Sequence, residues 1–287
     1  MTQTSTNAPF ESIGISAEEF KLFQQFIYER VGINLSEQKQ GLLVTRLNKH
    51  IKKLGLRSFR DYYDYLTRDT TGHELSELIN QVSTNHTFFF REKAHFDFMT
   101  EAVLPQITQT LSSRGELDLR VWCAASSTGE EPYGLGMTLM EFLGDRYSSW
   151  SAGLLATDVS SQALETAQNG FYSDDRVASV PAHLKAKYFI RVDETTWQVK
   201  PHLRKEITYR RFNLMNKTFP FRKPFHIIFC RNVLIYFDQQ TVEELIHRMY
   251  TWTAPGGYLF VGHSESLGRI NNPYRYIKPS VYRKDGL

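Results

Sequence analysis

Cysteine is scarce in this sequence: Cys123 and Cys230 are the only two in 287 residues. Both lie inside apolar, strand-like runs, which favours buried thiols and argues against a disulfide framework. Buried free thiols are typical of proteins in a reducing cytoplasm. We therefore expect a cytoplasmic protein that is held together by its hydrophobic core.

Long hydrophobic runs are also missing. No stretch approaches the roughly 18 apolar residues of a membrane span. The first residues, MTQTSTNAPF, lack the basic and apolar segments of a signal peptide. We expect no direct insertion into a membrane, and we expect residues 1–15 to form a disordered lead.

An excess of either charge is missing too, because the formal net charge is only +3. One segment departs from this balance. Residues 38–60 contain no acid, and they carry Arg46, Lys49 and Lys53 on one face of a predicted helix. Two interpretations stay open for this segment: a solvated helix face, or a docking surface for an acidic partner.

Apolar residues, in contrast, make up 41% of the chain, enough for one large domain and a small one. Residues 16–83 have helical spacing throughout. Ser16 and Glu19 stand at the spacing of a capping box, which marks the start of the first helix. The pattern predicts an N-terminal helical domain over residues 16–83.

Residues 120–140, RVWCAASSTGEEPYGLGMTLM, read as a buried strand, a loop of small residues and a helix with Pro132 in its first turn. Proteins of the α/β class use this geometry to bring the backbone close to a nucleotide. Glu130 and Glu131 would repel a pyrophosphate but attract an ammonium or sulfonium group, which favours S-adenosylmethionine. An ordinary capped helix in a phosphate-binding protein is the alternative.

Further apolar strands follow. One ends at Asp158, where doubly wound folds bind ribose hydroxyls, and another ends at Arg231 and Asn232. Residues 171–210 interrupt the rhythm and predict a small β insertion. The expected fold class is α/β, a doubly wound sheet over residues 94–287 that is joined to the helical domain by a connector at residues 84–93.

Six motifs now stand in order along the chain: TNHTFFFRE, RVWCAASSTGEEPYGLGM, ATDVS, FNLMN, IIFCRNVLIYF and GGYLFVGHSES. In this order and spacing they resemble the CheR-type chemotaxis receptor methyltransferases over nearly the whole chain. The loop departs slightly from the family pattern, since it reads Ala-Ser-Ser-Thr-Gly where many relatives have Cys or Ala before Ser-Thr-Gly. A small residue is kept there, so the close approach of the backbone should survive.

The resemblance implies a class I methyltransferase-type sheet and S-adenosylmethionine as cofactor, with S-adenosylhomocysteine as product. It implies that the acceptors are glutamate side chains on the cytoplasmic helices of a chemoreceptor, a methyl-accepting chemotaxis protein. In some members of the family, the β insertion docks a short peptide at the receptor C-terminus, and the sequence leaves this open here.

The resemblance also assigns site residues. The implied cofactor contacts are Asn85, Thr87, Arg91, Glu130, Asp158, Asn213, Leu214, Arg231 and Asn232. Tyr236 is implied to lie near the transferred methyl group, so Arg91 and Tyr236 are the expected catalytic residues. The docking surface would then be Arg46, Lys49 and Lys53.

The chemistry of these residue types agrees with that assignment. Glu130 can meet the methionine ammonium, and Asp158 can accept both ribose hydroxyls. Arg91 can hold the cofactor carboxylate or the incoming glutamate, unless it forms a salt bridge with Glu92 or Glu130 instead.

A glutamate, with an ordinary pKa near 4.3, is already ionised at neutral pH, so the reaction needs no general base. We accordingly expect neither a metal nor a catalytic triad, and we expect His95 and His263 to be structural. We also expect a monomer without a nucleic-acid partner.

Two other functions compete with this one. An N-methyltransferase would present Asn-Pro-Pro-Tyr or Phe after its fourth strand, whereas Asn232 is followed by Val-Leu-Ile-Tyr without prolines. A non-catalytic module that senses the cofactor or binds nucleic acid could use the basic helix, but that helix lacks the stacking aromatics of a single-strand binder.

Overall fold

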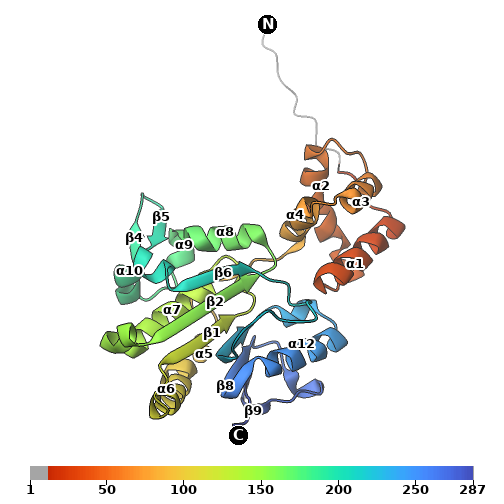
Figure 1. The fold of residues 1–287 in the computed structure, drawn as a ribbon. Coiled ribbons are helices and arrows are strands. Elements are labelled where there is room, and N and C mark those ends of the chain that lie inside the picture. Colours follow the sequence, from red (N-terminus) through yellow and green to blue (C-terminus); the bar gives the residue numbers. More distant parts are fainter. Residues whose placement is uncertain (1–11, 287) are drawn as a thin grey trace. The chain divides into compact units, whose positions relative to one another are not determined.

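The structure is a computed structural model that describes residues 12–286. The chain divides into two compact units between Ser83 and Thr84, a small helical one and a larger one built on a sheet (Figure 1). Within residues 12–286, no helix combines the length and the apolar composition that crossing a membrane requires.

The smaller unit consists of helices α1 (Ala17–Val31), α2 (Gln40–Lys53), α3 (Phe59–Arg68) and α4 (His73–Val82), with a short turn η1 (Glu37–Lys39) before α2. Helix α1 begins at the predicted capping box: Ser16 Oγ accepts from the Glu19 N–H at 3.2 Å, and the Glu19 carboxylate accepts from the Ser16 N–H at 2.8 Å. The core is aromatic, because the buried Phe23 ring stacks on Tyr62 at 5.8 Å and meets Phe59 edge-on at 5.9 Å.

Part of the segment before α1 contacts helix α2. Residues 1–11 of the predicted disordered lead lie outside the described residues. Residues 12–15 are tied to α2: the Asn48 side chain accepts from the Ile13 N–H at 2.8 Å and donates to the Ile13 carbonyl at 3.0 Å. The disorder of residues 12–15 stays a prediction, beside this contact in which a side-chain amide offers both a donor and an acceptor to Ile13.

The larger unit is organised by a seven-stranded sheet in the order β6-β2-β1-β7-β8-β10-β9. Its strands are β1 (Asp118–Cys123), β2 (Ser151–Asp158), β6 (Ile207–Arg211), β7 (Phe225–Cys230), β8 (Thr253–Val261), β9 (Arg275–Lys278) and β10 (Val281–Arg283). Strands β6, β2, β1, β7 and β8 pair in parallel, whereas β10 and β9 are antiparallel additions at one edge. The chain order changes direction at β1, which lies between β2 and β7.

Helices of this unit cover both faces of the sheet, as Figure 1 shows. Outside the insertion, the helices and short helical turns of this unit are α5 (Lys93–Phe98), the π-helical η2 (Met99–Val103), α6 (Leu104–Ser113), α7 (Glu130–Leu143), η3 (Gly144–Ser149), α8 (Ser161–Asn169), η4 (Leu234–Tyr236), α12 (Gln239–Thr251) and η5 (Leu267–Arg269). Alternate residues of one strand enter different cores: Val121 packs with α6 and α7, and Trp122 packs with α12. Strand β7 is buried along its whole length, as a central parallel strand should be.

The insertion contains a second, three-stranded sheet in the order β3-β5-β4, formed by β3 (Phe171–Ser173), β4 (Phe189–Arg191) and β5 (Thr196–Val199). It also contains short helices α9 (Asp174–Val177), α10 (Ala182–Tyr188) and α11 (Pro201–Arg204), which its sequence did not suggest. Strand β6 begins at Ile207, so the last four residues of the expected 171–210 insertion belong to the main sheet.

Candidate active site

Polar side chains follow the parallel strands at the points where those strands end. Asp158 ends β2, Asn213 follows β6, Arg231 follows β7 and His263 follows β8. The loop after β1 leads into α7. Because parallel strands place their carboxyl ends at one edge of a sheet, these residues gather beside the point where the strand order reverses, the usual ligand site of such folds.

Asp158 organises the loop after β1. Its carboxylate accepts the Ser127 N–H at 2.8 Å and the Ser160 N–H at 2.9 Å. Ser127 has a positive φ of 48°, and Gly129 has φ 99° with no room for a Cβ, which would come within 2.7 Å of Ala167 and Tyr172. Asp158 is partly exposed and keeps lone pairs beyond these two bonds.

Glu130 is fully buried at the start of α7 and is already neutralised by protein groups. The guanidinium of Arg176, from α9, pairs with its carboxylate, and Thr128 Oγ1 donates to it at 2.9 Å. Glu130 as the partner of a methionine ammonium stays a prediction. The ammonium would have to share this carboxylate with Arg176 or displace it.

Arg231 occupies the centre of a buried ionic cluster. Its guanidinium lies 2.6 Å from the Glu131 carboxylate and 2.9 Å from Glu92, and it donates to the Arg91 carbonyl at 2.6 Å. Burial opposes ionisation of Glu92, but the charge of Arg231 and donors from His263 and Asn232 hold the pKa of that carboxyl below its usual range. Arg231 as a cofactor contact stays a prediction; its side chain links the connector to the segment after β7.

The connector is anchored by Phe89, which is fully buried and meets Tyr172 and Phe189 edge-on. This leaves Asn85 and Thr87 partly exposed, and the Asn85 carbonyl accepts from Ser127 Oγ at 3.3 Å. Within residues 12–286, the Arg91 guanidinium forms no ion pair with a carboxylate; it donates to the His86 carbonyl at 3.1 Å. The alternative of a salt bridge to Glu92 or Glu130 is therefore not observed.

The segment after β6 contributes mainly backbone. Asn213 Oδ1 accepts the Met215 N–H at 3.0 Å, which shapes the turn. The Leu214 side chain is buried in the core beside α12, and its carbonyl accepts from Arg248 at 3.3 Å. A contact between Leu214 and a cofactor would therefore use its N–H group.

Glu265 fixes the segment after β7. This buried carboxylate accepts N–H groups of Gly262 at 2.6 Å, Asn232 at 2.7 Å and Ile235 at 3.2 Å. Asn232 adopts a positive φ of 57°, and Tyr236 ends the short helix η4, where its side chain is partly exposed. Glu265 thus holds the backbone that carries the two predicted site residues.

The predicted docking residues lie on α2 in the smaller unit. Arg46 donates to the Val82 and Ser83 carbonyls at 2.7 and 3.1 Å and so binds the end of α4. Lys49 and Lys53 are exposed. The lysines fit a docking role better than Arg46 does.

Sequence reasoning missed the roles of Glu92, Glu131, Arg176 and Glu265. Three of them stand inside the motifs FFFRE, GEEP and GHSES, so their positions were visible although their partners were not. No sequence motif marked Arg176, because only the fold of the insertion brings its side chain to Glu130.

These residues fit S-adenosylmethionine. The loop after β1 consists of small residues, and the partly exposed Asp158 keeps lone pairs that suit the hydroxyls of a ribose. Arg91 has no carboxylate partner among the described residues, which suits the carboxylate of the cofactor. Glu130 and Glu131, however, are already paired with Arg176 and Arg231, so the loop carries no unpaired negative charge from these two glutamates.

Comparison with known proteins agrees with that fit. The family model described as "CheR methyltransferase, SAM binding domain" matches residues 85–283, and "CheR methyltransferase, all-alpha domain" matches residues 18–83. The chain is 39% identical to a chemotaxis protein methyltransferase of Borreliella burgdorferi over 274 residues, which covers 96% of each chain. It is 34% identical to the chemotaxis protein methyltransferase of Escherichia coli over 275 residues, 95% of this chain and 92% of that one.

The predicted fold class and the predicted cofactor are thereby confirmed. The chain belongs to the CheR methyltransferase family, and its sheet-containing unit is the S-adenosylmethionine-binding domain of a chemotaxis methyltransferase.

Proposed function

We propose that this enzyme transfers the methyl group of S-adenosylmethionine to glutamate carboxylates on the cytoplasmic helices of a chemoreceptor. The products are a glutamate methyl ester and S-adenosylhomocysteine. The reaction takes place in the cytoplasm, in agreement with two buried free thiols.

The observation that carries this proposal is the state of the acids at the strand ends. Glu92 and Glu131 are paired with Arg231, Glu130 is paired with Arg176, and Asp158 and Glu265 accept backbone N–H groups. A lysine, with an ordinary pKa near 10.4, must lose a proton before it attacks, whereas a glutamate is already an anion at neutral pH. The four glutamates are engaged, and the spare lone pairs of Asp158 are assigned to the ribose, so no acid is left to take that proton. This suits a carboxylate acceptor better than an amine.

The chemistry is a direct displacement. S-adenosylmethionine supplies an electrophilic methyl group on a sulfonium; a glutamate oxygen forms the new C–O bond as the C–S bond breaks, and no proton moves. Two opposite charges disappear together, so exclusion of water and alignment favour the reaction. Arg91 and Tyr236 are proposed to position the acceptor, since the Arg91 guanidinium has no acidic partner within the described residues.

The experiment uses methyl-labelled S-adenosylmethionine and the purified cytoplasmic fragment of a methyl-accepting chemotaxis protein. The labelled product should release methanol on mild alkaline treatment, because a carboxyl ester is base-labile. A control fragment with glutamine in place of the accepting glutamates should take up no label. A label that survives alkali would assign the enzyme to nitrogen methylation and overturn the proposal.

A further inference from the structure

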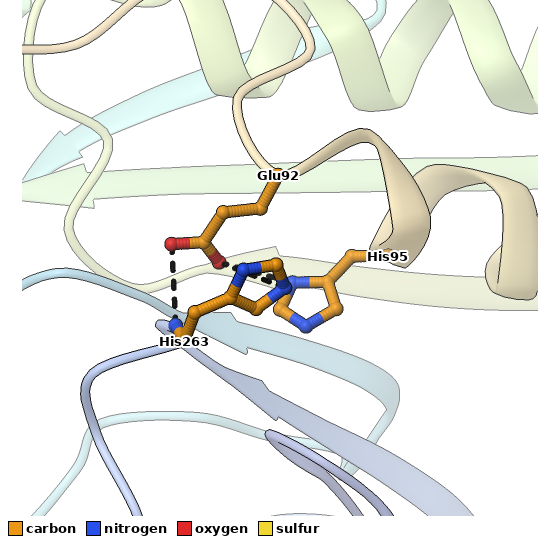
Figure 2. Close-up of side chains that lie close together, drawn as sticks. All are labelled: Glu92, His95 and His263. Carbon is orange, nitrogen blue, oxygen red and sulfur yellow. Dashed lines mark hydrogen bonds and ion pairs between the residues drawn. The ribbon is translucent and has the colours of Figure 1, made fainter.

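Three potential metal ligands converge next to the buried ionic cluster (Figure 2). Glu92 ends the connector, His95 lies in α5 and His263 follows β8. His95 Nδ1 lies 3.4 Å from Glu92 Oε2, and His263 Nε2 lies 3.9 Å from the same oxygen. One ligand atom from each residue falls within 4.8 Å of the other two.

Three buried atoms in these groups lack hydrogen bonds: both ring nitrogens of His95 and one carboxylate oxygen of Glu92. His95 is 1% exposed, and neither of its ring nitrogens has a partner. Glu92 Oε2 forms an ion pair with Arg231 Nη2 at 2.9 Å but accepts no hydrogen bond. Buried polar groups are nearly always satisfied, so two adjacent orphaned atoms indicate a shared partner.

We propose that Glu92, His95 and His263 form a binding site for Zn²⁺ or a similar borderline divalent ion. Two imidazoles and one carboxylate are a ligand set that Zn²⁺ uses with water as fourth ligand. This departs from the expectation of a metal-free protein, and it does not depend on the proposed methyl acceptor.

The spacing suits such an ion. Bonds of about 2.0–2.2 Å in a tetrahedron place neighbouring ligand atoms about 3.4 Å apart. The separation of His95 from Glu92 already has this value. His263 must approach Glu92 by about half an ångström, and it must approach His95 by up to about 1.4 Å, because the ligand atoms lie within 4.8 Å of one another. The His263 side chain is 52% exposed, so it can turn toward the site while water reaches the open position.

The local charge also permits a cation. Arg231 would repel the metal, but Glu131 lies 2.6 Å from the same guanidinium. Glu92 and Glu131 together carry two negative charges against the single positive charge of Arg231, which leaves the cluster with one net negative charge. Two nitrogen ligands favour Zn²⁺, Co²⁺ and Ni²⁺ over Mg²⁺ and Ca²⁺, which prefer oxygen.

The test is a metal titration of the untagged full-length chain after treatment with a chelator. Co²⁺ should bind one equivalent with the visible absorption of a tetrahedral site, and Zn²⁺ should displace it while Mg²⁺ does not. His263→Ala should weaken Co²⁺ and Zn²⁺ binding at least about tenfold, as expected for loss of a ligand. His183→Ala, which removes an exposed histidine outside the cluster, should leave both affinities unchanged.

His95→Phe provides a second arm, because a ring of similar size replaces the buried imidazole; tryptophan fluorescence verifies folding. This variant should lose the tetrahedral spectrum. Undiminished binding in His263→Ala, or no stoichiometric binding to the wild-type chain at micromolar metal, would overturn the assignment.

Discussion

Asp158 links the end of β2 to the loop after β1, since it terminates β2 and its carboxylate accepts the Ser127 N–H of that loop. We expect Asp158→Ala to weaken S-adenosylhomocysteine binding by about 1–3 kcal/mol, because ribose hydroxyls and loop N–H groups lose their acceptor. Isothermal titration calorimetry measures this loss. Asp145→Ala, at an exposed acid of η3, is the matched control, and an unchanged affinity in folded Asp158→Ala would contradict the assignment.

His226 provides a pH-dependent contribution to stability. It is 8% exposed, and its Nδ1 accepts the Arg120 N–H at 3.0 Å, which only a neutral ring nitrogen can do. Burial, with a smaller effect of Arg120, lowers the pKa of His226 to about 4. Between these pKa values His226 is protonated in the unfolded chain but neutral in the folded chain. The free energy of unfolding therefore falls as the pH drops from about 6.5 toward 4.

Between pH 7.5 and pH 5, this effect should remove about 2 kcal/mol from the free energy of unfolding. His226→Asn keeps an acceptor near the Arg120 N–H and should lose correspondingly less. Urea unfolding followed by tryptophan fluorescence is the measurement, because all four tryptophans lie after residue 83 and report on the larger unit. Equal pH dependence in wild type, His226→Asn and the control His183→Asn would refute it.

At the scale of elements, helix α2 presents two separate surfaces. Its buried residues Leu43, Leu47 and Ile51 form the core side, while Lys49 and Lys53 are exposed one turn apart. Lys49→Glu with Lys53→Glu should raise the apparent KM for a receptor fragment, more strongly at low salt, because exposed charges act mainly on the encounter rate. Cofactor affinity should stay the same.

Arg46 is left unchanged in that variant, because its bonds to α4 would confound folding with docking. Lys21→Glu with Arg68→Glu makes the same change in charge at exposed positions of α1 and α3. Normal methylation by the Lys49 and Lys53 variant at low ionic strength would show that α2 is only a solvated face.

The edge of the small sheet is the second element with an open surface. Strand β4 lies at one end of the order β3-β5-β4, and Ile190 on it is 53% exposed. An exposed edge can accept an added strand, so a receptor tail could dock there. In the antiparallel β4–β5 pair the Ile190 N–H faces Gln198, whereas the Arg191 N–H faces away from β5. Arg191→Pro removes this outward donor and should weaken the binding of a receptor fragment that keeps its last residues, but not of a truncated one. Equal affinities of wild type for both fragments would rule out tethering.

At the scale of the whole molecule, the order of elements was predictable, because helical and strand periodicities are local properties of the chain. The strand ends were predictable as well, since Asp158, Asn213 and Arg231 each follow a strand-like run. Local sequence patterns do not predict the partner with which a charged residue pairs. The pairings of Glu130 with Arg176 and of Glu131 with Arg231 join residues 46 and 100 positions apart.

The contact between α2 and the segment before α1 shows the same limit on a smaller scale. Its composition indicates disorder, but one asparagine on α2 satisfies the backbone of Ile13. The helices of the insertion were missed because each has only four to seven residues, too short for a periodic signal.

The burial of both cysteines has a practical chemical consequence. Cys123 and Cys230 are 0% exposed, and burial raises the pKa of both thiols well above the ordinary value. A disulfide-exchange reagent should therefore find no reactive thiol in the native chain and two after denaturation, as absorbance of the released thiolate would record. Fast native reaction would show that the core opens. A cysteine introduced at Ile190 would then be the single nucleophile open to a fluorescent maleimide, so the dye would report from the β4 edge alone.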